Sequence, residues 1–155
     1  MSLITETCQQ LNQGNKKALI PYFTCGFPTA KVFSQLVIQA GDTGAADLIE
    51  IGIPFSDPLA DGPSIQFSSQ KGLENKITVE KSLNLLSYIS TRIKTPLVIM
   101  SYLNPLLQYG QEKFLRDANE IGISGLIVTD LVIEEGKALE SKSKKFSLDL
   151  VYLLA

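Results

Sequence analysis

Five short apolar runs, separated by stretches with helical periodicity, constrain the fold of this 155-residue chain more than any other feature. The runs are Ala18–Cys25, Ala46–Ile53, Pro96–Tyr102, Ile123–Thr129 and Leu148–Leu154. Their largely continuous apolar character is typical of strands that are covered on both faces in a parallel sheet. The alternation of strand and helix predicts an α/β protein with helices packed outside the sheet. We see no linker or low-complexity tract, and we predict one domain over residues 1–155.

The stretches between the runs repeat apolar residues at the spacing of an amphipathic helix. Thr29 and Thr78 precede two of these stretches, and we predict that both are N-caps. The predicted helices cover residues 2–13, 30–40, 64–73, 79–89, 111–120 and 134–145. The segment with Asn104, Pro105 and Gly110 is interpreted as a loop.

Two architectures fit this pattern: an open doubly wound sheet, or part of a (β/α)₈ barrel. A sheet that binds a dinucleotide should carry G-x-G-x-x-G after its first strand, but Cys25–Pro28 stands there instead. Polar residues follow three of the other strands, namely Asp61, Tyr102 and Asp130. This placement suits the active face of a barrel.

The chain contains no histidine. It therefore cannot build a histidine-based catalytic triad or an ordinary histidine metal site, and we predict no metal. Acid–base chemistry must come from Asp, Glu, Tyr, Lys or Cys, so carboxylates are the first candidates.

Composition excludes several other classes of protein. With 45% apolar and 19% charged residues, the composition is that of an ordinary globular protein. A net charge of −2 argues against a basic surface that binds nucleic acid. No apolar run approaches the roughly 18 residues of a membrane span, and residues 1–7 lack the pattern of a signal peptide. The two cysteines form no motif and suit a reducing compartment. We predict a cytoplasmic protein.

The stretch Asp47–Pro63, DLIEIGIPFSDPLADGP, is where we expect the chemistry. It begins as a strand and continues as a loop stiffened by three prolines, with carboxylates at Glu50, Asp57 and Asp61. Glu50 is unusual, because a carboxylate within an apolar strand is tolerated only if it is paired, protonated or used.

Four segments together resemble the tryptophan synthase alpha subunit. They are IEIGIPFSDPLADGPSIQ (49–66), PYFTCGFP (21–28), MSYLNP (100–105) and GLIVTDL (125–131). The resemblance implies a (β/α)₈ barrel that cleaves indole-3-glycerol phosphate to indole and glyceraldehyde 3-phosphate in tryptophan biosynthesis. It also implies a heterotetramer with a beta subunit that consumes the indole. The pyridoxal phosphate belongs to that beta subunit, and no cofactor is expected in this chain.

The cleavage needs a proton at indole C3, a base for the side-chain hydroxyl and stabilisation of charge on the ring nitrogen. Glu50 would project into the barrel, where desolvation raises its pKa toward acid–base use. Asp61 would lie nearer solvent, stay ionised and accept the indole N–H. By resemblance, Glu50 and Asp61 match the family's catalytic pair.

The resemblance also implies roles for other positions. Tyr22, Met100 and Tyr102 match residues that line the indole pocket, and Tyr22 stands where phenylalanine is usual. Asp57 and Asn104 match positions that meet the beta subunit.

Structural roles are the alternative for each of these residues. Glu50 could pair with a lysine, Asp57 could cap a turn and Asp130 could cap a helix. Tyr22, Met100 and Tyr102 could be packing residues.

The length departs from the family pattern, because a full barrel takes about 250 residues and this chain holds about five of eight units. Strands six to eight and the usual phosphate-binding loops are missing, so the first and fifth strands should be open edges. Residues 131–133 also lack the proline that the family prefers. Three hypotheses remain: a lyase, a non-catalytic remnant that binds the beta subunit, and an unrelated open-sheet binding domain.

Overall fold

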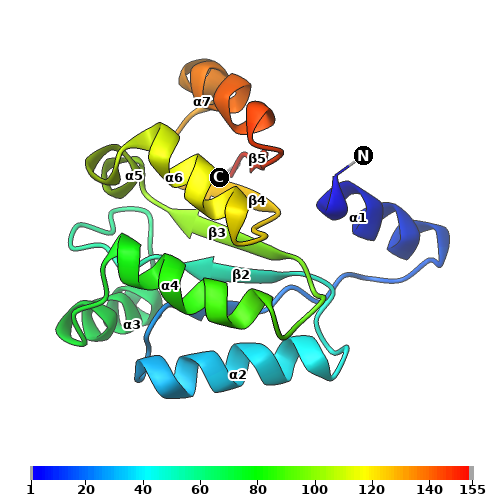
Figure 1. The fold of residues 1–155 in the computed structure, drawn as a ribbon, viewed down its shortest axis with the longest axis horizontal. Coiled ribbons are helices and arrows are strands. Elements are labelled where there is room, and N and C mark those ends of the chain that lie inside the picture. Colours follow the sequence, from blue (N-terminus) through cyan, green and yellow to red (C-terminus); the bar gives the residue numbers. More distant parts are fainter. Residues whose placement is uncertain (1, 154–155) are drawn as a thin grey trace.

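The computed structural model describes residues 2–153 and contains a five-stranded parallel sheet (Figure 1). Its strands are β1 (Tyr22–Thr24), β2 (Ile49–Gly52), β3 (Leu97–Ser101), β4 (Gly125–Val128) and β5 (Asp149–Val151). All five predicted strands are present, each shorter than predicted, and Leu154 of the fifth lies outside the described residues.

The strands neighbour one another in chain order, β1-β2-β3-β4-β5. A doubly wound sheet reverses its order at a switch point, whereas a (β/α)₈ barrel adds each strand beside the last one. The order therefore excludes the doubly wound alternative and indicates about five units of a barrel. Within the described residues, β1 and β5 are edge strands, as predicted.

The helices are α1 (Leu3–Gln13), α2 (Ala30–Asp42), α3 (Pro63–Glu74), α4 (Val79–Ser90), α5 (Leu103–Tyr109), α6 (Gln111–Glu120) and α7 (Ile133–Lys145). The two predicted N-caps are confirmed: Thr29 accepts from the Val32 N–H and Thr78 from the Lys81 N–H, each at 3.2 Å. No helix within residues 2–153 is long and apolar enough to cross a membrane.

The interpretation of residues 103–110 as a loop is wrong, because α5 occupies most of this segment. Pro105 lies in the first turn of α5, where the missing N–H of proline is tolerated. Leu106 then packs fully buried in the core. Gly110, at φ +96°, ends α5 and separates it from α6.

The sheet has two unlike faces. Residues of the outer face pack under the helices and form the hydrophobic core, and they include Ile49, Ile51, Leu97, Ile99, Leu126 and Val128. Residues on the inner face are aligned by register: Tyr22 lies beside Glu50, and Gly52 beside Met100. The core therefore lies between sheet and helices, and Glu50 and Tyr22 lie on the inner face.

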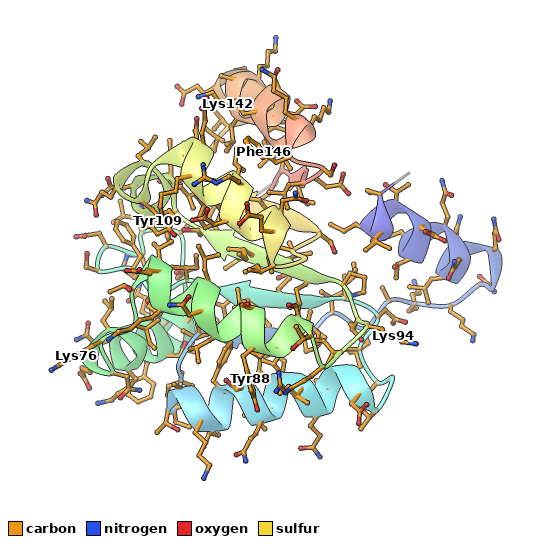
Figure 2. All side chains as sticks on the ribbon, viewed as in Figure 1. Lys76, Tyr88, Lys94, Tyr109, Lys142 and Phe146 are labelled. Carbon is orange, nitrogen blue, oxygen red and sulfur yellow. The ribbon has the colours of Figure 1, made fainter. Side chains whose placement is uncertain are left out.

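Over the outer face, α2 lies beside α4, which is followed by α5, α6 and α7, each in contact with the one before it, whereas α3 contacts β1. Figure 2 shows side chains filling this layer, with Tyr88 lying between α4 and α2. The helix α1 lies apart from this row, at the end of the sheet where the strands begin (Figure 1). Ile4 of α1 packs closely against Gly125, the first residue of β4. The opposite end, where the strands finish, is the end that carries the predicted site.

Candidate active site

Four of the predicted site residues line one small cavity at the carboxyl ends of β2, β3 and β4. They are Tyr22, Asp61, Met100 and Tyr102. The cavity measures about 10 Å³, which is room for about one water molecule. The structure thus brings these residues together, but around a space far smaller than an indole ring.

Glu50 lies on the inner face of β2, beside Tyr22 on β1 and Val98 on β3. It is half-buried, and this burial raises the pKa of its carboxyl group, as predicted. Among the contacts of residues 2–153, no ion pair involves Glu50, so a structural pairing with lysine is not what holds it there.

Asp61 lies near the end of the loop that follows β2. Burial raises the pKa of its carboxyl group as well, and a hydrogen bond with Tyr102 opposes this rise. The sequence predicts an aspartate near solvent, with an environment clearly separated from that of Glu50. The two environments differ less than predicted, because Asp61 also lines the cavity and loses hydration there.

Glu50 is not among the residues that line the cavity, but its charge and that of Asp61 both act on a third ionisable group, the Tyr22 hydroxyl. Burial raises its pKa, and the charges of Asp61 and Glu50 raise it further, while a hydrogen bond with Thr24 opposes the rise. The ring lies over Gly52, where an added Cβ would come within 1.9 Å of the Tyr22 hydroxyl oxygen. Gly52 therefore makes room for a tyrosine at position 22.

Tyr102 is buried, with 5% of its surface exposed. Its hydroxyl oxygen accepts a hydrogen bond from the Ala60 N–H at 2.8 Å, and its ring stacks at a tilt on Phe55, with ring centroids 5.1 Å apart. Sequence reasoning missed the roles of Ala60 and Phe55. Neither an alanine amide nor a loop phenylalanine carries a signal in the sequence.

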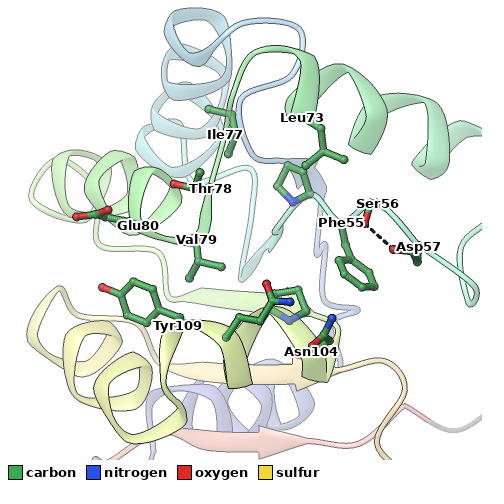
Figure 3. A pocket seen from close by; sticks show the side chains of 13 residues that line it. Phe55, Ser56, Asp57, Leu73, Ile77, Thr78, Val79, Glu80, Asn104 and Tyr109 are labelled. Atoms are coloured by element: carbon green, nitrogen blue, oxygen red, sulfur yellow. Dashed lines mark hydrogen bonds between the residues drawn. The ribbon is translucent and has the colours of Figure 1, made fainter.

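The two residues predicted to meet a partner line one groove outside this cavity. Asp57 from the loop after β2 and Asn104 from α5 border a groove of about 600 Å³, together with Val79 and Tyr109 (Figure 3). The Asp57 carboxylate accepts a hydrogen bond from the Ser56 hydroxyl at 2.5 Å. The structure therefore brings Asp57 and Asn104 onto one surface.

Asp130 follows β4 and accepts a hydrogen bond from the Leu103 N–H at 2.8 Å. This amide belongs to the first turn of α5, whose N–H groups have no acceptor within the helix. Asp130, from the loop after β4, supplies the missing acceptor. Its interpretation as a helix-capping residue is confirmed. Within residues 2–153, no group of three or more Cys, Asp or Glu side chains is arranged to hold a metal ion.

Comparison with known proteins identifies the family of this chain. The sequence model of the family described as "Tryptophan synthase alpha chain" matches residues 8–155. The chain belongs to the tryptophan synthase alpha chain family. Among curated members, the alpha chain of Petrotoga mobilis is 43% identical over 141 residues, covering 91% of this chain and 54% of that one. The alpha chain of Geotalea uraniireducens is 39% identical, covering 99% of this chain and 57% of that one.

Solved structures of alpha chains agree with this family. The alpha subunit from Legionella pneumophila str. Paris superposes with a TM-score of 0.94 at 35% identity, covering 99% of this chain and 59% of that one. A ligand-free tryptophan synthase from M. tuberculosis superposes with a TM-score of 0.91 at 31% identity. The chain thus spans little more than half the length of the relatives it matches, and its fold is a partial TIM barrel.

Proposed function

We propose that this chain carries the catalytic carboxylates of an indole-3-glycerol phosphate lyase. The supporting observation is that Glu50 lies beside Tyr22 in the sheet and that Asp61 lines the same cavity as Tyr22. The charges of both carboxylates raise the pKa of the Tyr22 hydroxyl. Burial raises the pKa of the Glu50 carboxyl group, which favours proton transfer over permanent ionisation.

The proposed reaction breaks the bond between indole C3 and the glycerol chain. Glu50 acts as general acid and base: a proton is added at C3, and a proton leaves the hydroxyl on the adjacent side-chain carbon. The electron pair of the broken bond remains with the ring, and the hydroxyl carbon becomes the aldehyde of glyceraldehyde 3-phosphate. Asp61 accepts the indole N–H and stabilises positive charge that develops on the nitrogen.

We assign Tyr22, Met100 and Tyr102 to the wall that the indole ring would contact. The cavity between them has only about 10 Å³ of free space, so substrate entry requires the loop after β2 to move. The proposal assigns no phosphate-binding residue within this chain. We therefore expect negligible lyase activity from these 155 residues alone.

The proposed partner is the tryptophan synthase beta subunit, which would contact Asp57 and Asn104. Their groove of about 600 Å³ has apolar surface from Val79 and Tyr109 beside the polar groups of Asp57 and Asn104. Such a mixture is typical of a protein–protein interface. The pyridoxal phosphate of the pathway's second step is proposed to belong to that beta subunit and not to this chain.

One observation favours a second candidate function, in which the chain binds the beta subunit without catalysis. The partner groove is open and far larger than the catalytic cavity. A chain with this geometry could keep the interface while lacking a complete substrate pocket.

The deciding experiment measures indole release from indole-3-glycerol phosphate, with and without a beta subunit, for the wild type and for Glu50→Gln. Activity that needs the beta subunit and disappears in Glu50→Gln supports the lyase. Binding of the beta subunit without indole release supports the second function. Ready turnover by the isolated chain would contradict our expectation that these residues alone are inactive.

A further inference from the structure

The segment 55–61, which carries Asp61, is held at both of its ends by α3. Ser69 bonds to the backbone of Phe55, accepting from its N–H at 2.9 Å and donating to its carbonyl at 3.1 Å. Gln66 donates to the Asp61 carbonyl at 2.9 Å. These contacts join the segment to one helix only, and Leu59 in its middle is 94% exposed.

Tyr102 supplies the remaining connection. Among the hydrogen bonds of residues 2–153, the bond from the Ala60 N–H to the Tyr102 hydroxyl is the one that joins segment 55–61 to a residue outside α3. A phenol can accept one hydrogen bond and donate another. The Tyr102 hydroxyl also lowers the pKa of the Asp61 carboxyl group, and Tyr102 and Asp61 line the same cavity.

We propose that Tyr102 is a positioning residue, whose hydroxyl holds segment 55–61 against the end of β3 and so keeps Asp61 facing the cavity. This inference rests on the proposed function, because it assigns a purpose to the position of Asp61. It differs from the role that the resemblance gives to Tyr102, which is to line the indole pocket, since the hydroxyl accepts a hydrogen bond from the Ala60 N–H of the protein itself.

Tyr102 is itself rigidly placed. Its side chain is 5% exposed and packs on Phe55, which belongs to the same segment. The next residue, Leu103, has its N–H bound by Asp130 at 2.8 Å, which fixes the backbone immediately after Tyr102. A rigid support of this kind is what a catalytic group needs to keep its productive geometry.

The test uses Tyr102→Phe, which removes the hydroxyl and keeps the ring, with Tyr22→Phe as the matched control. Tyr22 lines the same cavity, but its hydroxyl makes no bond to segment 55–61 among the described contacts. Two properties are measured by NMR: amide hydrogen exchange at Ala60 and the pKa of the Asp61 carboxyl group. Neither requires turnover.

In Tyr102→Phe we expect exchange at Ala60 to become at least about tenfold faster, because the N–H loses its acceptor. We also expect the pKa of Asp61 to rise, because the hydrogen bond that opposes its increase is removed. Tyr22→Phe should leave both properties unchanged. A merely structural role of the Tyr102 ring would alter neither, since the ring remains.

Unchanged exchange at Ala60 and an unchanged Asp61 pKa in folded Tyr102→Phe would overturn the proposal. If this variant did not fold, the wild type supplies a second test, in which Ala60 should exchange more slowly than Ser56, whose N–H has no partner among the described contacts. Equal exchange of these two amides would also overturn it. If Tyr102→Phe changed both properties as expected but the wild-type chain showed no lyase activity in any complex, the proposed function would be wrong. The inference about Tyr102 would still stand.

Discussion

Two glutamates of this chain experience opposite electrostatic environments. Burial on the inner face of β2 raises the pKa of Glu50, whereas hydrogen bonds from Lys71 and Gln70 lower the pKa of Glu74 on the surface of α3. The folded state therefore favours the protonated form of Glu50 and the ionised form of Glu74. The two glutamates should therefore affect the pH dependence of stability in opposite directions, and this difference tests whether the pKa of Glu50 is raised.

We predict that Glu50→Gln raises the free energy of unfolding at pH 8 and that this gain disappears as the pH falls toward 4. Because the native pKa of Glu50 lies above the unfolded value of about 4.3, the native state binds its proton more strongly. Its ionisation costs stability above the native pKa, and below the unfolded value both states are protonated. Urea unfolding at a series of pH values measures the difference.

Glu74→Gln is the matched control for this measurement. The pKa of Glu74 is lowered in the folded state, so its ionised carboxylate stabilises the fold at pH values above the pKa of the unfolded state. This contribution is lost as the pH falls through the folded-state pKa. The control should therefore lower the free energy of unfolding at pH 8 and have little effect at low pH. A Glu50→Gln variant that followed the same course as Glu74→Gln would contradict the prediction.

At the level of elements, α5 connects the cavity to the groove, because Tyr102 precedes it and Asn104 lies in its first turn. Tyr102 is the N-cap residue, but its side chain makes no capping hydrogen bond. The carboxylate of Asp130 supplies a bond to the first turn from the neighbouring loop instead. The start of α5 thus depends on a contact between two loops that are distant in the sequence.

We predict that Asp130→Ala lowers the free energy of unfolding by about 1 kcal/mol, the usual cost of removing an N-cap oxygen. Asp130→Asn is the matched control, since its amide oxygen can still accept from the Leu103 N–H. Chemical denaturation of the three proteins gives the comparison. Equal losses in the Ala and Asn variants would show that the hydrogen bond does not hold α5.

Local signals were sufficient for most elements of this fold. Thr29 and Thr78 each bond an amide three residues later, so their capping role needs only nearby residues. The same kind of signal failed at Asn104–Pro105 and Gly110, which favour a turn locally but belong to α5 and its end because the segment buries Leu106. Tertiary packing outweighed the local preference there.

The candidate site was predictable only in part. The apolar setting of Glu50 indicated a reactive carboxylate, and its raised pKa agrees with that reading. The loss of hydration at Asp61 and the bond between Tyr102 and Ala60 were not predictable, because both depend on how the loop after β2 folds over the end of β3. Such contacts join segments far apart in the sequence and leave no periodic pattern.

At the scale of the whole molecule, the described sheet leaves its edges and part of its inner face uncovered. Strand β5 has a neighbour on one side only, and Val151, aligned with the buried Ile127 of β4, is 38% exposed. An edge strand offers unpaired backbone groups to another chain, and apolar side chains strengthen that contact. The isolated chain should therefore associate with itself.

We predict that the weight-average mass of the isolated chain rises with concentration in sedimentation equilibrium, and that Val151→Lys shifts this rise to concentrations about tenfold higher. A lysine on an edge strand opposes pairing, because association would bury its charge, and a tenfold shift corresponds to about 1.4 kcal/mol. Val132→Lys is the matched control, since Val132 is 55% exposed at the start of α7, away from the sheet edge. If both variants associated like the wild type, the open edge of β5 would not be the surface through which the chain associates. If Val132→Lys alone weakened association, contact would instead pass through the end of α7, next to the loop that carries Asp130.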